Sequence, residues 1–270
     1  DAERLDMGGA GVEIAGDVAV RTMNVSGSDN LIKGNLMANG GGAAFKQGSL
    51  EVGGNAEFNN GFLQMQDTED KLLVKGNLAL GETYGSSKGE CLTNGTVEVK
   101  GDFTSNYKET GSNWYGYYET NMHKTIFSGE KTQKISFKEP SQVNGFNDNL
   151  ELQNNAINFA TPLYSLTVNN DMAISKTKDL QIVTQLIINN GSFVTTGNVE
   201  ANMLYINNTK ENQIQGNLNM TGTVVFKKGS LEVRGNAKFD NGYLQMQDTE
   251  DKLLVKGNLT LGETYGSSKG

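Results

Sequence analysis

Residues that build redox, zinc and imidazole-based sites are nearly absent from this chain of 270 residues, which has one cysteine and one histidine. Cys91 therefore has no internal disulfide partner, and His123 has no second histidine or cysteine pair with which to form a zinc site or a catalytic pair of imidazoles. The sequence argues against redox and zinc chemistry, and no cofactor is expected.

Proline, long apolar runs and an excess of positive charge are also scarce or missing. Glycine-rich disordered chains are usually rich in proline, and this chain has 34 glycines but only 2 prolines, so we do not expect disorder. No apolar run approaches the roughly 18 residues that a membrane helix requires, so we expect no membrane insertion. The net charge of −8 would repel a phosphate backbone, so we expect no nucleic-acid partner.

The chain does contain a long internal duplication. Residues 45–89 align with residues 226–270 at a constant offset of 181, and 39 of the 45 positions are identical. Weaker similarity extends the two copies to 11–89 and 192–270. Between them, segment 104–160 departs from the pattern and is irregular and rich in aromatic residues.

A shorter repeat lies within the duplication. A glycine followed by Asn or Asp recurs at separations of 18 to 25 residues within each half of the chain, at Gly16, Gly34, Gly54, Gly76 and Gly101, and then at Gly197, Gly216, Gly235 and Gly257. Periods of about 20 residues are typical of stacked supersecondary units. Glycine is expected at these corners because it adopts positive φ, and Asn because it tolerates the left-handed region and hydrogen-bonds nearby backbone.

The residues between the corners alternate with a period of two, as in Gly48-Ser-Leu50-Glu-Val52, which indicates short strands rather than helices. We therefore predict an all-β fold, a parallel β-solenoid (β-helix) that runs as one domain over 1–270. At about 21 residues per coil it would have about 12–13 coils. Its handedness stays open. The side chains predicted to point inward are Leu50, Val52, Leu63, Leu231, Val233 and Leu244.

A family resemblance supports this fold. The segment HKTIFSGEKTQKISF at 123–137, followed by Pro140-Ser141 and by FNDNLELQN at 146–154, resembles a segment of large repetitive surface proteins of Gram-positive, mostly anaerobic bacteria. With its flanking coils, the resemblance covers most of the chain. Such regions are similar to the β-solenoids of filamentous-haemagglutinin-like adhesins, which implies an extracellular, non-enzymatic stalk or fibre. The resemblance supplies no catalytic residues.

The densest acidic cluster is a weak candidate for calcium binding. It comprises Asp67, Glu69 and Asp70 and recurs in the second copy as Asp248, Glu250 and Asp251. Parallel β-helices that act on polysaccharides use paired carboxylates or calcium-binding aspartates. A solvated turn that was duplicated with its coil is the favoured interpretation, because the spaced ligands of a dedicated calcium loop are missing. His123 is expected to lie at the start of a strand over a tyrosine.

Aromatic side chains form the one cluster that indicates a binding surface. Five of them fall within twelve residues, namely Tyr107, Trp114, Tyr115, Tyr117 and Tyr118. Aromatic faces stack on sugar rings and anchor protein contacts, and they also cover irregular coils. The alternatives of a structural cover, a contact with a neighbouring chain and a glycan site therefore stay open.

The favoured function is that of a structural, non-enzymatic repeat protein at the bacterial cell surface. It would act as a rigid stalk or a self-associating fibre, with identical chains or neighbouring repeats as partners. One alternative is a carbohydrate-binding adhesin module that uses the aromatic cluster. A third is a β-helical enzyme acting on polysaccharides, for which no catalytic residues are proposed.

Overall fold

The computed structural model describes residues 2–9, 11–82, 91–108, 116–120, 122–141, 144–146, 150–154, 156–168, 172–174 and 179–266, with the backbone alone for 172–174 and 263–266. The chain divides into two compact units, Asp1–Asn149 and Leu150–Gly270. The described residues form no helix, and so none that is long and apolar enough to cross a membrane. The fold is all-β, as predicted.

The first unit holds twelve of the described strands. They are β1 (Ala2–Met7), β2 (Glu13–Ile14), β3 (Val18–Ile32), β4 (Leu36–Val52), β5 (Ala56–Asn59), β6 (Leu63–Gln64), β7 (Lys71–Val74), β8 (Leu78–Leu80), β9 (Thr96–Val99), β10 (Phe103–Ser105), β11 (Lys124–Phe127) and β12 (Gln133–Phe137).

The second unit holds the other twelve described strands. They are β13 (Leu150–Leu152), β14 (Ile157–Phe159), β15 (Leu163–Val168), β16 (Met172–Ile174), β17 (Leu180–Ile188), β18 (Phe193–Thr195), β19 (Val199–Ile214), β20 (Leu218–Met220), β21 (Val224–Val233), β22 (Ala237–Met246), β23 (Lys252–Val255) and β24 (Leu259–Gly266).

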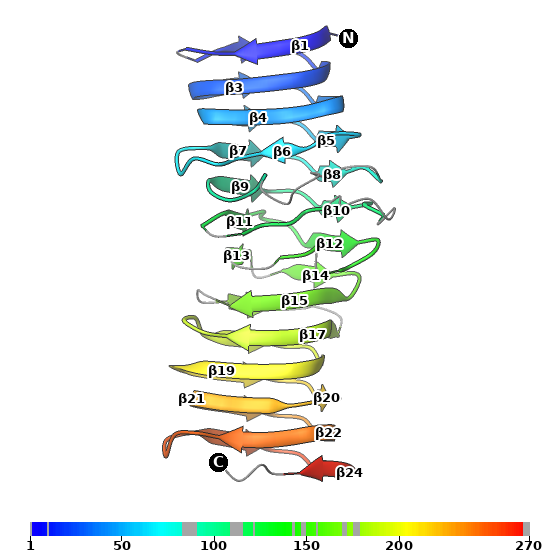
Figure 1. Ribbon diagram of the computed structural model, residues 1–270, viewed down its shortest axis with the longest axis vertical. Coiled ribbons are helices and arrows are strands. Elements are labelled where there is room, and N and C mark those ends of the chain that lie inside the picture. Colours follow the sequence, from blue (N-terminus) through cyan, green and yellow to red (C-terminus); the bar gives the residue numbers. More distant parts are fainter. Residues whose placement is uncertain are drawn as a thin grey trace. The chain divides into compact units, whose positions relative to one another are not determined.

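Parallel pairing between successive coils builds each unit, as the stacked strands in Figure 1 show. In the first unit β3 pairs with β4, and β4 in turn pairs with β5, β6 and β7 along its length. In the second unit β17 pairs with β19, and β19 pairs with β20 and β21. Each coil thus rests on the coil before it. The units are β-solenoids, and their continuity as one solenoid remains a prediction.

The number of turns is lower than predicted. The two units contain about 11 turns instead of 12–13. The reason is that coil length is not constant: successive corner residues lie 18, 20, 22, 25 and 32 residues apart in the first unit. The last two coils take up more chain than the average of about 21 residues on which the estimate rested. In the second unit the spacing stays at 19 and rises to 22 only at the last corner.

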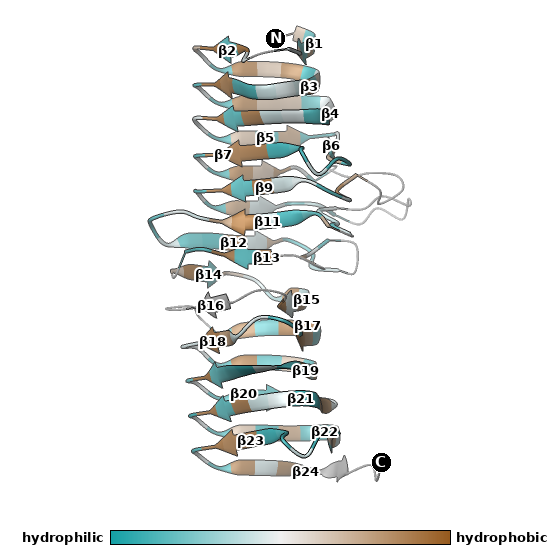
Figure 2. Ribbon diagram, turned by 90° about the vertical axis from the view of Figure 1, so that its left-hand side faces the viewer, coloured by the Kyte–Doolittle hydropathy of each residue, from teal (hydrophilic) through white to brown (hydrophobic). Residues whose placement is uncertain are grey.

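The core of each unit is filled by alternate residues of the strands. Hydrophobic and hydrophilic residues follow one another along strands such as β4 and β19 (Figure 2). Leu50, Val52 and Leu63 are at most 2% exposed, and Leu231 and Val233 at most 1%, which confirms that they point inward. Leu244 is half-buried, although it lies in register with the buried Val224. The period-two alternation therefore places the inner face correctly.

A ladder of Asn and Asp side chains joins the coils at one corner. In the first unit the backbone N–H of Asn55 donates to Oδ1 of Asn35 and that of Asn77 to Oδ1 of Asn55, each at 2.8 Å. The series begins at Asp17, whose Oδ1 accepts the backbone N–H of Asn35 at 2.7 Å. It continues at Asp102, whose backbone N–H donates to Oδ1 of Asn77. In the second unit Asn198, Asn217, Asn236 and Asn258 repeat it at 2.7–2.9 Å. The side chain of each coil thus satisfies a backbone donor of the next.

The glycine before each ladder residue serves a different purpose from the one expected. None of the described ladder glycines adopts positive φ, because the positive-φ glycines lie elsewhere, for example at Gly42 and Gly95. A Cβ on Gly76 would lie 2.5 Å from Oδ1 of Asn55 and 2.6 Å from the carbonyl oxygen of Gly54. Glycine is therefore needed for close approach between coils, not for backbone conformation.

We predict that Gly76→Ala lowers the free energy of unfolding by roughly 3 kcal/mol, because the methyl group forces two backbones apart. Gly16→Ala is the matched control, since a Cβ on Gly16 meets nothing within 4 Å. The control should leave stability unchanged or raise it slightly, because it restricts only the unfolded chain. Urea unfolding followed by circular dichroism measures both variants. Equal losses in the two would contradict the close-approach explanation.

Candidate functional site

The acidic cluster of the first copy closes a turn. The buried side chain of Asp70 accepts the backbone N–H groups of Gln66 and Asp67 at Oδ2, both at 3.0 Å, and that of Gly48 in the preceding coil at Oδ1, at 3.2 Å. Asp67 accepts the N–H of Glu69 at 3.1 Å. This hydrogen bond, together with a second one from the Gln47 amide, holds the pKa of the Asp67 carboxyl below its usual value. The carboxylates of Asp67 and Asp70 therefore act as hydrogen-bond acceptors for backbone N–H groups of this turn and of the preceding coil.

The second copy reproduces this turn. Asp251 accepts the N–H groups of Gln247, Asp248 and Gly229, all at 2.8 Å, and Asp248 accepts that of Glu250 at 2.9 Å. In the part of the chain that the structure describes, no three Asp, Glu, His or Cys side chains converge in a way that could hold a metal ion. The repeated hydrogen bonds fit a turn that was duplicated with its coil, but in the first copy Asp70 is buried rather than solvated, because it accepts three backbone N–H groups.

The structure describes three of the five aromatic residues of the cluster, and two of these three are buried. Tyr107 is 2% exposed and Tyr117 is 0% exposed, so neither ring offers a contact surface. This corrects the expectation for these two residues. Tyr118 is half-buried and forms a parallel bridge to Gly145. Trp114 and Tyr115 lie outside the described residues, so their assignment as contact residues stays a prediction.

Aromatic rings from several coils surround Phe103 in the core of the first unit. The ring centroid of Phe103 lies 5.0 Å from that of Tyr117, 5.4 Å from Phe137, 5.6 Å from Phe146 and 6.0 Å from Phe127. Edge-to-face and tilted arrangements of this kind are the favourable ones for aromatic pairs. The motif at 123–137 thus supplies two of the rings, through alternating inward positions of β11 and β12.

Several polar groups in the same core form hydrogen bonds with one another. The hydroxyl of Tyr117 lies 2.8 Å from Oγ1 of Thr125, which donates to the buried carboxylate of Glu119 at 3.2 Å. Because the hydroxyl of Tyr117 has this partner, the whole side chain can be buried. Asn144 accepts hydrogen bonds from Oγ of Ser105 and from the backbone of Tyr117. These contacts account for polar residues at inward positions of the irregular segment.

His123 belongs to this core as well. It directly precedes β11, and its ring meets that of Tyr117 edge-on at 6.4 Å, as the sequence predicted. Nδ1 donates to the carbonyl oxygen of Asn94 at 2.8 Å, while Nε2 is buried and has no hydrogen-bond partner among the described residues. Burial lowers the pKa of His123 to about 4, and the hydrogen bond to Asn94 opposes this only in part. The imidazole is therefore neutral at pH 7.

Comparison with protein-family models, with curated proteins and with solved structures finds no match for this chain. The assignment to a β-solenoid thus rests on the coils themselves. The sequence located the acidic turns and the recurrent Gly-Asn corners, and it predicted that the corner Asn hydrogen-bonds nearby backbone. It did not show that this backbone belongs to the next coil, although the recurrence of Asn or Asp at the coil period is the signal from which that contact could have been inferred.

Asp70→Ala should lower the free energy of unfolding by about 3 kcal/mol, because three backbone N–H groups lose their acceptor at a buried position. Glu69→Ala in the same turn is the control, with a change within about 0.5 kcal/mol expected for an exposed side chain.

Thermal unfolding with added calcium and with a chelator tests the calcium alternative. A melting temperature that rises with calcium would favour a metal site over the capped turn.

Stability should also depend on pH through His123. Its pKa is lower in the folded protein than the usual 6.5, so the unfolded chain binds a proton that the folded one does not. The contribution of the neutral ring is complete above pH 6.5 and is lost as the pH falls towards 4, by roughly 3 kcal/mol in total.

The measurement compares the free energy of unfolding from pH 7 to pH 4 in the parent and in His123→Gln. The two proteins are otherwise identical in sequence, so the difference between the two curves isolates the imidazole. Parallel curves would show that His123 is accessible to protons in the folded state.

Proposed function

We propose that this chain is a structural, non-enzymatic segment of a β-solenoid repeat protein on the outside of a bacterial cell, where it acts as a stalk or a self-associating fibre. The observation that carries the proposal is the ladder, because the same contact joins successive coils in both units. Because this contact does not depend on the rest of the coil, a repeat protein can gain or lose coils while the remaining coils keep the same contact.

The duplication supports the same function. Both copies keep the stacking register: Leu50 pairs with Leu72 in the first unit, as Leu231 pairs with Leu253 in the second. The capped acidic turn is also repeated. The conserved features of the copies are therefore those that hold coils together, which is what a structural array requires.

The resemblance of segment 123–137 to repetitive Gram-positive surface proteins supplies the cellular location in this proposal. In the structure the alternating residues of this segment fill the core, since Phe127, Ile135 and Phe137 are fully buried. A segment whose recurring residues pack the core is expected in a structural scaffold. Association with identical chains or neighbouring repeats, without nucleic acid or membrane insertion, completes the proposal.

Antibodies raised against this chain should label intact, unpermeabilised cells of the organism that makes it. A cytoplasmic protein probed in parallel is the control for lysis. Labelling that appears only after permeabilisation would overturn the location, and release of sugars from acidic polysaccharides by the purified chain would replace the scaffold with the enzyme alternative.

A further inference from the structure

Each unit carries a groove on an outer face of its sheet, which we call the polar groove. In the first unit this groove has a volume of about 320 Å³ and crosses β3, β4 and β7. Its lining includes Asp29, Ser49, Glu51, Lys71 and Leu73. Sites for small ligands begin at about this volume, so the groove is large enough for a small molecule.

The polar groove of the second unit corresponds to it through the duplication. It has a volume of about 300 Å³ and crosses β19, β21 and β23. Its lining includes Glu211, Ser230, Glu232, Lys252 and Leu254. The two grooves thus share an acidic residue, a serine, a glutamate, a lysine and a leucine.

Opposite charges lie at the two ends of each groove. In the first unit Ser49 pairs in register with Lys71, and the backbone N–H of Asp29 donates to Oγ of Ser49 at 2.8 Å. The register of β19, β21 and β23 sets the same acid–serine–lysine column in the second unit. The acidic residue and the lysine are therefore two coils apart, which is about 10 Å.

These terminal charges have few partners within the protein. Asp29 and Glu211 form no ion pair with any residue that the structure describes, and the same is true of Lys252. Nζ of Lys71 lies 3.7 Å from a carboxylate oxygen of Glu98, close to the upper limit of about 4 Å for an ion pair. The ends of the groove can therefore bind charged groups of a ligand.

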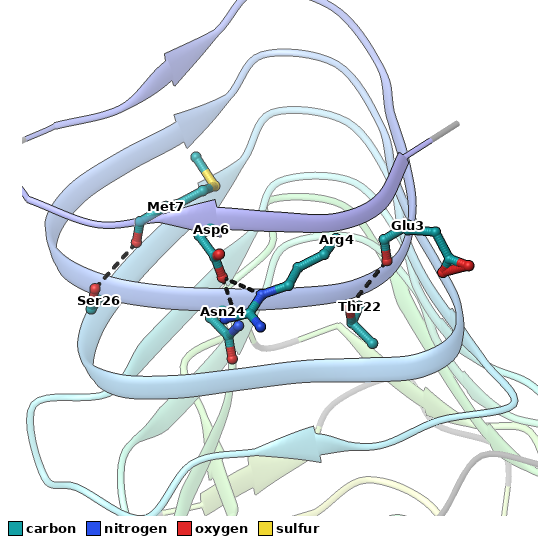
Figure 3. Close-up of polar contacts among 7 residues, drawn as sticks. All are labelled: Glu3, Arg4, Asp6, Met7, Thr22, Asn24 and Ser26. Carbon is teal, nitrogen blue, oxygen red and sulfur yellow. Dashed lines mark hydrogen bonds and ion pairs between the residues drawn. The ribbon is translucent and has the colours of Figure 1, made fainter.

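Charges on another outer face of the first unit are paired instead. There Asp6 accepts hydrogen bonds from Asn24 at 2.7 Å and from Arg4 at 2.9 Å, as Figure 3 shows. Unpaired charges are thus a property of the polar groove and not of every outer face.

The carboxylate in the middle of each groove is compensated by a cation. Nζ of Lys75 lies 2.6 Å from Oε1 of Glu51, and Nε of Arg234 lies 3.0 Å from Oε1 of Glu232. Lys75 belongs to the next coil, whereas Arg234 directly follows the strand of its partner. With this carboxylate compensated, each groove has one negative end and one positive end.

Near-identity of the two copies does not by itself explain this agreement. Segments 45–89 and 226–270 supply the serine, the glutamate, the lysine and the leucine, but Asp29 and Glu211 lie outside them. These two residues differ in type and keep their charge. The compensating cations differ in position and keep theirs. The polarity of the groove is therefore retained where the sequence has changed.

A small zwitterion fits this polarity. Two charge-assisted hydrogen bonds of about 2.8 Å each leave roughly 4 Å of the distance between the two ends for the ligand itself. At about 3.5 Å per residue, the ammonium and the carboxylate of a free amino acid or a short dipeptide lie about that far apart. A ligand with a single charge would leave one end of the groove unpaired.

The position of the leucine indicates how a dipeptide would lie. Leu73 and Leu254 are each two residues beyond the lysine on the same strand, so both side chains point to the same outer face. An apolar C-terminal residue of the ligand would thus meet the leucine while its carboxylate meets the lysine. We infer that each unit binds one zwitterion of the amino-acid or dipeptide class in its polar groove.

This binding activity goes beyond the proposed scaffold. The scaffold does not depend on it, because no ladder residue lines either groove. Loss of zwitterion binding would leave the proposed structural function intact, and failure of that function would leave the grooves in place.

Nuclear magnetic resonance titration of the whole chain with glycyl-leucine tests the inference, because backbone amide shifts report on the two grooves separately. The amides of Ser49 and Ser230 should shift to saturation with a Kd in the millimolar range, since contacts of exposed charges are individually weak. N-acetyl-glycyl-leucine lacks the ammonium and glycyl-leucinamide lacks the carboxylate. Each should bind about threefold more weakly than glycyl-leucine, or weaker still.

Two variants make each groove the control for the other. Lys252→Gln should weaken binding at Ser230 about threefold and leave binding at Ser49 unchanged, and Lys71→Gln should do the reverse. Loss of folding would disturb both grooves, and the capped peptides test the unmodified protein. Lys227→Gln removes an exposed lysine outside the grooves and should change neither Kd.

Three results would overturn the inference. They are the absence of saturable shifts at both serines, binding of either capped peptide as tightly as glycyl-leucine, and unchanged binding at Ser230 in Lys252→Gln. Shifts at the serines that follow protein concentration and not peptide concentration would show that the grooves belong to a contact between copies instead.

Discussion

The hydrogen bond between a backbone N–H at one corner and the Asn or Asp side chain one coil earlier is the contact on which the stacking of this protein depends. It requires two coils to approach closely, and only a residue without a Cβ allows that approach at the preceding position. Gly54 and Gly76 illustrate this, since each faces the glycine and the Asn of the coil before it. Strand register, and with it the inner face, follows from this fixed corner.

Variation in coil length has little effect on this arrangement. Coils of 18 to 32 residues share the same corner in the first unit. Described residues of the irregular segment that enter the core include polar ones. Glu119, Thr125 and Asn144 are buried there because each has hydrogen-bond partners. The described residues at 116–146 thus contribute to the core of the first unit.

The outer faces are free to differ because stacking uses the corner and the interior. In the first unit, for example, Asp6 on an outer face accepts hydrogen bonds from Asn24 and Arg4. A scaffold of this kind can present distinct surfaces at a fixed spacing without a change of fold.

The sequence by itself determined the fold class, the repeat and the inward residues such as Leu50 and Leu231, because period-two alternation and corner spacing are local signals. It also identified the acidic turn. Only the tertiary structure decided why the corner glycines are needed, how many turns form, and that Tyr117 is buried. These features depend on which residues of different coils meet, and the varying length of the coils hides that register from the sequence.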